Sequence, residues 1–575
     1  MTIKKKINIL LFLILFGGSL VRVWGINFGL PNIHIIDEQG IVYSAFYAAA
    51  NNLRIADYTN GQLIVYLISF EYGFYFIVGK FLGMFQQAED LLISYLRDPT
   101  ALFLIARLPL AAGGVLAVWT LFHIGNKFFN SRVGYISAFL LSFSFLHVKE
   151  SHYLKEDVVS SLFVLLSFYF VLKMRAGKVK DYVLAGIFFG LAFGAEYKAV
   201  VFLPVVFIAH ILQRKMADFH KIFYFAISSL LTFLAINPYY IIEFNRTLES
   251  LLAFSKLQSV IYLSHLQGKP IWWWFMFDHI PQGIGYIFFI AAFLGFGICM
   301  MRGRRERQYL LIPLVPITFF LTVDLWTKMH FARYAMVTLP FFALGGAVFL
   351  DFVGSKIKNE RKRNILLAVL AIMLIFPSFL RTVKFDSLLT KPDTRIIAKE
   401  WFESTIPASS KVLVESTLKP EYQSNLNVSL NLDEKSINKR IGDAERRGLK
   451  GSYVKSLLRA NKGRIGYDIV ATTQVGAKRD IFTDEETRLK NSDYYLDSRI
   501  TYIVLTSWVQ EKMKSEFEKS LYEHYQKIRE FRPTYEFKTD PHFIKMDYEA
   551  LDKVDIFRKD LIFGPTISIY QLRHD

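Results

Sequence analysis

The sequence predicts an α-helical polytopic membrane protein with about 11 transmembrane helices, followed by a C-terminal extracytoplasmic α/β domain. Three observations predict this fold class. Hydrophobic residues make up 53% of the 575 residues and the mean hydropathy is +0.29, which is too apolar for a wholly soluble chain. Apolar segments suited to a bilayer recur as far as residue 380. Beyond it, charged residues occur throughout and no such segment remains.

The expected membrane spans are segments of about 16 to 22 apolar residues, because a helix needs roughly 20 residues to cross a bilayer core. Lysines and arginines cluster in alternate connections, such as "NKFFNSR" and "RGRRER", and basic residues accumulate in cytoplasmic loops. An odd number of spans then predicts a cytoplasmic N-terminus and an extracytoplasmic C-terminal domain. The expected spans are 7–26, 101–122, 133–148, 158–173, 182–197, 199–213, 220–237, 283–301, 309–323, 334–353 and 364–380.

Residues 27–100 are expected to form one large external loop with interfacial amphipathic helices. The stretch 62–84 is long enough for a twelfth span, but it contains Glu71 and Lys80, and counting it would place basic loops outside. The first segment has the basic start of a signal peptide but no small-residue cleavage site, so we expect it to remain as a helix.

Two domains follow from this division, a transmembrane domain over 1–380 and a soluble domain over 381–575. In the second, the helical pattern of "DTRIIAKEWFEST" precedes four strand-like stretches, "KVLVES", "YDIVAT", "TYIVLT" and "TISIYQL". The intervening "LNLDEKSINKRIGDAERRGLKGS" is expected to be a loop or a solvated helix.

Charge and cysteine content exclude two other classes of protein. The formal net charge is +18, but the basic residues lie between apolar segments rather than on one soluble face, which argues against nucleic-acid binding. A single cysteine, Cys299, excludes an intramolecular disulfide framework and a Cys-rich metal site.

Ionisable residues gather at the predicted external mouths of the spans, where they mark a functional cavity. Carboxylates in such a place can act as a general base or bind a divalent metal, and arginine and lysine can hold an anionic leaving group. This composition fits transfer from a phosphate-linked donor, and the location favours a lipid phosphate. The candidates are Arg22, His34, Asp37, Glu38, Arg107, His152, Lys155, Asp157, Lys198 and Arg333.

Each signal also has a structural alternative. Asp37 and Glu38 can be an ordinary charge pair at a helix N-terminus. The stretch "KESHYLKED" can be a solvated loop holding its own ion pairs. Arg22, near the end of the first span, can extend to the lipid headgroups. Only the shared side and depth of these residues favours a functional site.

Five stretches in order resemble a known class of enzymes. They are "VRVWGINFGLPNIHIIDEQG", "LIARLPLAAGGVLAVWTLFHIGNKFF", "HYLKEDVVSSLFVLLSFYF", "GLAFGAEYKAVVFLPVVFI" and "HFARYAMVTLPFFAL". Together they resemble the GT-C class of integral membrane glycosyltransferases, in the group of protein O-mannosyltransferases and lipid A aminoarabinose transferases. The resemblance covers roughly residues 7–380.

The resemblance implies an inverting transferase that uses a polyprenyl-phosphate-linked sugar in the inner or plasma membrane. Asp37 matches the catalytic acid of the first external loop, with Glu38 beside it, and Asp157 matches the second acid. The acceptor is a protein, a glycolipid or a cell-wall glycan. A divalent metal (Mg, Mn or Zn) held by these three acids is left open. The remaining positions implied are Arg107, Lys155, Lys198 and Arg333 for the lipid phosphate, with His34, His152 and Arg22 as accessory residues.

Two other functions compete with this interpretation. One is a transporter or flippase of a lipid-linked or anionic substrate, and the other is a non-catalytic membrane assembly protein. A transporter more often shows an internal repeat and charges at mid-membrane, whereas here the charges lie at one face. The pair Tyr197–Lys198 in "GAEYKA" also departs from the usual Thr-Lys of the class, which leaves the role of Lys198 open.

Overall fold

The computed structural model divides the chain into two compact units. The bundle unit comprises Met1–Ile26, Gly40–Glu71 and Ile105–Asp386, and the sheet unit comprises Asn27–Gln39, Tyr72–Leu104 and Ser387–Asp575. The structure describes residues 3–33, 36–55, 58–59, 61–213, 218–262, 268–327, 329–416, 430–446, 452–473, 496–507, 521–534 and 562–573.

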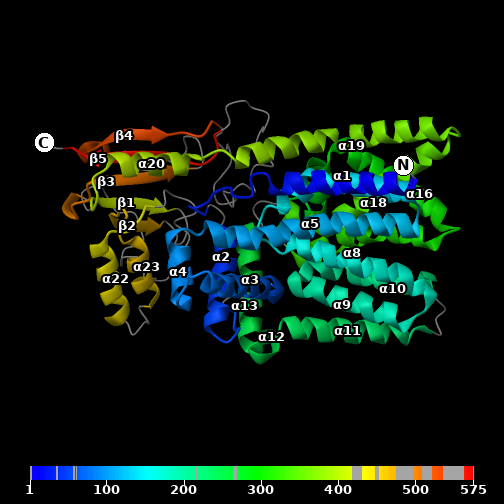
Figure 1. The fold of residues 1–575 in the computed structure, drawn as a ribbon, viewed down its shortest axis with the longest axis horizontal. Helices are drawn as coiled ribbons and strands as arrows, with labels where there is room; N and C mark the ends of the chain where they lie inside the picture. The colour runs from blue at the N-terminus through cyan, green and yellow to red at the C-terminus, as the bar shows by residue number, and fades with distance from the viewer. Residues whose placement is uncertain are drawn as a thin grey trace. The chain divides into compact units, whose positions relative to one another are not determined.

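The bundle unit is built from helices (Figure 1). Helices α2, α3, α5 and α19 run across the boundary between the two units. The described helices are α1 (Ile3–Val23), α2 (Ile36–Ala50), α3 (Gln62–Phe81), α5 (Thr100–Phe128), α6 (Ser131–Ser142), α7 (Phe145–Glu150), α8 (Asp157–Lys173), η1 (Met174–Ala176), α9 (Val179–Ala195), η2 (Tyr197–Phe202), α10 (Leu203–Gln213), α11 (Lys221–Ile236), α12 (Tyr239–Ile242), α13 (Phe244–Tyr262), α14 (Ile271–Trp274), the π-helix η5 (Phe275–His279), α15 (Ile280–Ile284), α16 (Tyr286–Gly303), η6 (Arg307–Leu310), α17 (Leu311–Trp326), η7 (Ala332–Thr338), α18 (Leu339–Ser355) and α19 (Glu360–Leu389).

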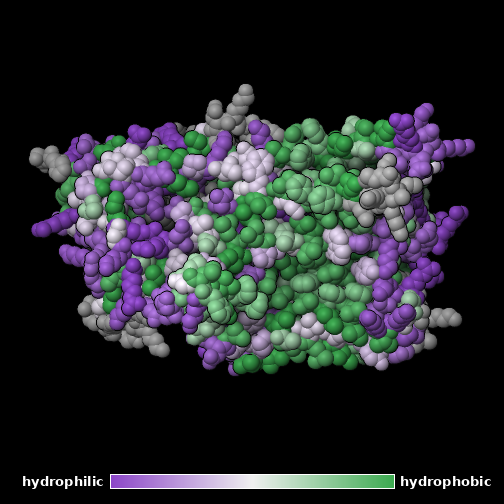
Figure 2. All heavy atoms as spheres, viewed as in Figure 1, coloured by the Kyte–Doolittle hydropathy of each residue, from purple (hydrophilic) through white to green (hydrophobic). Residues whose placement is uncertain are grey.

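The outer surface of the bundle is apolar, as a lipid-facing surface must be. On α11, Phe223, Ile227, Leu230 and Leu231 recur at helical spacing and are 55 to 62% exposed. Figure 2 shows a continuous hydrophobic surface over the bundle, with hydrophilic side chains gathered at the end where α1 begins. So much exposed apolar surface is incompatible with water, so the chain is an integral membrane protein.

Each of the eleven predicted spans lies mostly on helical residues, but 133–148 is broken at residues 143–144 into α6 and α7. Among the described residues, seven helices are long and apolar enough to cross a membrane, and three shorter apolar helices accompany them. Because α3 is one of the seven, the number of spans and the interfacial placement of α3 stay predictions. The seven candidate membrane spans are Gln62–Phe81, Thr100–Phe128, Asp157–Ala176, Tyr286–Gly303, Arg307–Leu325, Ala332–Ser355 and Glu360–Thr405.

One end of the bundle is marked by a buried carboxylate between two arginines. Asp351, near the end of α18, is 2.9 Å from Arg132 Nε at the start of α6 and 3.1 Å from Arg302 Nη1 at the end of α16. The start of α6 and the ends of α16 and α18 therefore lie together. The connections at this end are among the basic ones.

Helices α16 and α18 approach each other most closely at glycines. A Cβ atom on Gly295 would overlap the carbonyl oxygen of Gly345, so only glycine allows this approach. Gly297, two residues further along α16, faces open space. The pair offers a matched test of helix packing.

We expect Gly295→Ala to destabilise the protein by about 1 to 3 kcal/mol, because overpacking forces the helices apart. Gly297→Ala should be neutral or slightly stabilising, because alanine favours a helix where nothing obstructs it. Thermal unfolding of both variants in the same detergent measures the difference. Equal melting temperatures for the two would contradict this packing.

The sheet unit contains a five-stranded mixed sheet in the order β2-β1-β3-β5-β4. β1 pairs in parallel with β2 and β3, whereas β5 pairs antiparallel with β3 and β4. Helix α20 contacts β4 and β5 (Figure 1), and its Ala398 and Phe402 pack in the core of one face. The elements are α4 (Ala88–Arg97), α20 (Thr394–Thr405), β1 (Lys411–Ser416), α22 (Glu434–Arg446), α23 (Ser452–Asn461), β2 (Asp468–Thr473), β3 (Tyr502–Ser507), β4 (Tyr525–Phe531) and β5 (Thr566–Leu572).

Most elements of the sheet were expected from the sequence. The four strand-like stretches coincide with β1, β2, β3 and β5, and the helical pattern coincides with α20. The polar stretch in the middle forms helix α22. Strand β4 was not predicted, because "YQKIREF" mixes charged residues with apolar ones. It lies at the edge of the sheet, where charged side chains are common.

Candidate functional site

A buried ion pair between Asp157 and Lys198 forms the centre of the candidate site. Asp157 is the first residue of α8, and Lys198 lies in η2, directly after α9. Lys198 Nζ is 2.9 Å from Asp157 Oδ1 and 3.5 Å from Glu196 Oε2. Asp157 is 5% and Glu196 4% exposed, so this lysine interacts with two carboxylates away from water.

Arg333 and Tyr334 of η7 complete this cluster. Arg333 Nε is 3.8 Å from Asp157 Oδ2, and Lys198 Nζ lies 3.8 Å from the centre of the Tyr334 ring. The Arg333 guanidinium also covers the Phe331 ring at 4.5 Å. Cation–π contacts of this kind stabilise a desolvated cation. The structure thus brings together Asp157, Lys198 and Arg333 of the predicted site.

Sequence reasoning missed two members of the cluster. Glu196 was visible in "GAEYKA" and Tyr334 in "HFARY", but neither was assigned a role. A carboxylate before a lysine and a tyrosine after an arginine are common pairs. Only the fold, which places the start of η2 beside η7, shows that both face Lys198.

The connection between α7 and α8 is buried, so the alternative of a solvated loop at "KESHYLKED" is wrong. Lys149, Glu150, His152 and Lys155 are each at most 3% exposed. Lys149 Nζ lies 3.7 Å from Glu150 Oε1. Charged groups stay buried only when other polar groups hold them, and each of the four has such partners. A buried polar segment beside Asp157 is what a binding site requires.

Arg22 is fully buried in the structure, so the alternative that it extends to the headgroups is wrong. Its Nη2 lies 2.8 Å from His147 Nδ1, and its Nη1 donates to the backbone oxygen of Ser142. The guanidinium therefore ties the end of α1 to α6 and α7.

Arg107 and His152 hold the chain where it leaves α1. Arg107 Nη1 donates to the carbonyl oxygen of Ile26 at 2.7 Å. His152 Nε2 lies 3.0 Å from the carbonyl oxygen of Trp24 and 3.6 Å from Asp386 Oδ1. Both residues were predicted for the site. In the structure, both side chains contact carbonyl oxygens of the backbone that leads into the first loop.

Asp37 and Glu38 lie in the first turn of α2, where a helix dipole favours negative charge. Glu38 is fully buried and Asp37 is partly exposed. By the division into compact units, both belong to the sheet unit, whereas Asp157 belongs to the bundle unit. Their grouping with Asp157 therefore stays a prediction. His34 lies outside the described residues.

Asp37, Glu38 and Asp157 are the acids that the sequence offers as ligands of a divalent metal. Within the part of the chain that the structure describes, no three His, Cys, Asp or Glu side chains are arranged to hold a metal ion. Asp157 instead faces Lys198 and Arg333, and cations beside a carboxylate oppose metal binding. We therefore assign no step to a metal.

The chain is similar to one family profile and to several solved structures. A sequence profile described as dolichyl-phosphate-mannose-protein mannosyltransferase matches residues 101–242. ArnT from Cupriavidus metallidurans in the apo state is similar in structure, with a TM-score of 0.52 and 10% identity over 97% of each chain. Its complex with undecaprenyl phosphate gives a TM-score of 0.47 and 9% identity over 99% of this chain and 98% of ArnT.

The apo oligosaccharyltransferase of Archaeoglobus fulgidus gives a TM-score of 0.45 and 12% identity, over 87% of this chain and 69% of its own. No curated protein matches the chain. The likeness to apo ArnT shows the fold, so the predicted fold class is confirmed. The resemblance to GT-C glycosyltransferases is confirmed as well.

Proposed function

We propose that this protein is a glycosyltransferase that moves a sugar from a polyprenyl-phosphate-linked donor to an acceptor hydroxyl on the extracytoplasmic side of the membrane, with inversion. The fold and the family match support a glycosyltransferase. One observation supports a donor with a phosphate group, namely the buried cluster of Lys198 and Arg333 around Asp157. Lys198 and Asp157 lie inside the range matched by the dolichyl-phosphate-mannose-protein mannosyltransferase profile.

The cluster is suited to stabilise the negative charge that a phosphate group gains when it leaves the sugar. Lys198 and Arg333 are fixed in a buried environment, where electrostatic interactions are stronger than in water. Asp157 holds both cations before the donor arrives, so little reorganisation is needed when the phosphate meets them. Arg107 and Lys155, both buried, are the further candidates for the lipid phosphate.

Sugar transfer then proceeds as a single displacement. Asp37 removes the proton from the acceptor hydroxyl while that oxygen attacks the anomeric carbon. The bond between the anomeric carbon and the phosphate oxygen breaks, and its electron pair leaves with the polyprenyl phosphate. Lys198 and Arg333 stabilise this charge. One displacement inverts the anomeric centre, so one base suffices and no covalent sugar-enzyme intermediate forms.

The sidedness of the reaction is also a proposal. Basic connections mark one end of the bundle, and basic residues favour the cytoplasm. Asp157 lies at the start of α8, and Lys198 lies in η2, directly after the end of α9, so both are away from the basic connections. These positions support a site on the extracytoplasmic side, with a cytoplasmic N-terminus and an extracytoplasmic C-terminal domain.

The proposal is tested by incubating membranes that contain the protein with a panel of polyprenyl-phosphate sugars. We expect one donor to be consumed and polyprenyl phosphate to be released, in amounts that follow the quantity of protein. Membranes without the protein serve as the control. Movement of the lipid-linked sugar across the bilayer without its consumption would instead show a flippase.

We expect Arg333→Gln to weaken donor binding about 10-fold or more, because a hydrogen bond to a charged group contributes about 1.5 to 3 kcal/mol. Initial rates of transfer against donor concentration give the change in KM. Arg132→Gln is the matched control, since Arg132 also pairs with a buried aspartate but at the other end of the bundle. An equal change in both variants would contradict a phosphate role for Arg333.

A further inference from the structure

The chain turns sharply after α2, in a backbone conformation that needs support. Asn52 and Leu53 have φ angles of 53° and 65°, in the left-handed region that a leucine rarely adopts. Tyr239 Oη donates to the carbonyl oxygen of Asn52 at 2.6 Å, and Tyr66 Oη donates to that of Leu53 at 3.0 Å. Strain of this kind persists only where neighbouring groups fix the backbone. Here Tyr239 of α12 and Tyr66 of α3 are those neighbouring groups.

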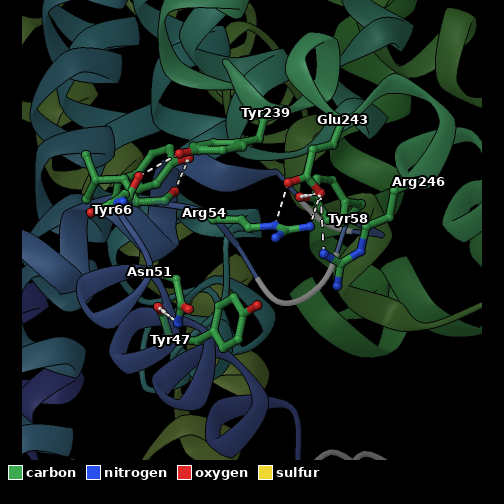
Figure 3. Close-up of polar contacts among 10 residues, drawn as sticks. Tyr47, Asn51, Arg54, Tyr58, Tyr66, Tyr239, Glu243 and Arg246 are labelled. Carbon is green, nitrogen blue, oxygen red and sulfur yellow. Dashed lines mark hydrogen bonds and ion pairs between the residues drawn. The ribbon is translucent and has the colours of Figure 1, made fainter.

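A single carboxylate holds the next part of the segment. Glu243, between α12 and α13, accepts hydrogen bonds from Arg54 Nη2 at 3.0 Å and from Tyr58 Oη at 2.8 Å (Figure 3). Arg54 Nε adds an ion pair of 2.5 Å to its other oxygen. Burial raises the pKa of the Glu243 carboxyl, but hydrogen bonds from Tyr58 and Arg54 outweigh it, so the net pKa lies below its usual value.

Arg246 completes this cluster from the first turn of α13. Its Nη1 lies 3.3 Å from Glu243 Oε2, and its guanidinium lies 5.2 Å from the centre of the Tyr58 ring. Figure 3 shows Arg54 and Arg246 on two sides of the Glu243 carboxylate, with Tyr58 beside it. Residues 54 and 58 are therefore both attached to the connection between α12 and α13.

The same segment is also tied to the residue before the site lysine. Tyr197 Oη donates to the carbonyl oxygen of Thr59, and Lys198 follows Tyr197 directly in η2. Asn237 Oδ1 accepts from the backbone nitrogen of Gln62 at 2.9 Å. Tyr197 replaces the threonine usual in the resembled class, and in this chain it links the turn after α2 to the helix that carries Lys198.

We propose that Glu243 is a positioning residue, which clamps the turn after α2 and thereby fixes the direction of α2. The proposal rests on the proposed function, because α2 is one unbroken helix whose first turn carries Asp37. A helix transmits a displacement along its axis, so a loosened turn at Ala50 shifts the carboxylate at the other end. Misplacement of a reacting group by about 1 Å can lower a rate roughly 100-fold.

The clamp is expected to act on rate rather than on stability. The side chains of Arg54 and Arg246 are 43% and 42% exposed. Ion pairs that are open to water stabilise a fold little. If Glu243 acted only through stability, its loss would lower the melting temperature together with the rate, whereas a positioning role lowers the rate alone.

The test compares Glu243→Gln with wild type in purified protein. We expect kcat to fall about 10- to 100-fold, with the KM for the donor and the melting temperature essentially unchanged. Hydrogen exchange of backbone amides in residues 51–62 should become faster. Glu243→Asp keeps a carboxylate for Arg54, Tyr58 and Arg246, so it should retain more of the rate than Glu243→Gln.

Glu530→Gln is the matched control. Glu530 also accepts from several donors, namely Lys527 at 2.8 Å, Ser568 at 3.0 Å and Arg532, but it lies in strand β4, opposite Ser568 of β5. Its loss should leave kcat unchanged. Glu243→Gln with wild-type kcat and unchanged exchange would overturn the proposal, and so would a fall in kcat that follows the melting temperature. A wild-type protein without sugar transfer would overturn the proposed function instead, while the exchange measurement would still report on the clamp.

Discussion

Replacement of Asp37 by asparagine should reduce sugar transfer about 10²- to 10⁴-fold, which is the usual contribution of a general base. Asparagine has nearly the same shape but cannot take a proton from the acceptor hydroxyl. Binding of polyprenyl phosphate should persist, because Lys198 and Arg333 are unchanged. Transfer rates at saturating donor, together with retention of the lipid after purification, measure the two effects.

Asp90→Asn provides a control of the same chemistry. Asp90, like Asp37, lies next to a glutamate in the first turn of a helix, here α4, so the substitution removes the same charge from a similar position. It should leave transfer unchanged. If Asp37→Asn retained the wild-type rate, another group would have to be the base.

Replacement of Lys198 by methionine should lower transfer about 10²- to 10³-fold, as loss of one charge-stabilising donor does in other enzymes. Methionine keeps the length of the side chain but removes the cation that faces the leaving phosphate. Rates measured over a range of donor concentrations should show a fall in kcat as well as a rise in KM.

Removal of this lysine leaves Asp157 with Arg333 but takes the lysine ammonium away from the buried Glu196, which can destabilise the fold. The double variant K198M/E196Q removes the negative charge of Glu196 as well. We expect it to regain stability without regaining transfer. A double variant that transferred sugar at the wild-type rate would contradict the role of Lys198.

The fold was largely predictable, because hydrophobic segments of span length mark helices wherever they pack. Each predicted span is mostly helical, although 133–148 is broken into α6 and α7, and α11 has only 16 residues. Hydropathy could not decide how α3 is placed, since its exposed Phe70 and Phe74 suit lipid and an interface alike. The charged strand β4 could not be predicted from alternation.

The site was predictable in part. Their common side of the membrane led to the proposal of Asp157, Lys198 and Arg333. In the structure, Lys198 and Arg333 each lie within 4 Å of Asp157. Sequence patterns cannot distinguish a charged residue in water from one buried among polar partners. For that reason Arg22 and "KESHYLKED" had surface alternatives that the fold removes, and Glu196, Tyr334 and Glu243 had no assigned role.

The most direct test of the central claim is the stoichiometry of a reaction with purified protein, the consumed donor and its acceptor. We predict that each polyprenyl phosphate released is matched by one glycoside of inverted configuration, and that Asp37→Asn forms neither while still retaining the lipid. Glycoside with retained configuration, or lipid phosphate released without glycoside, would contradict the proposed direct displacement.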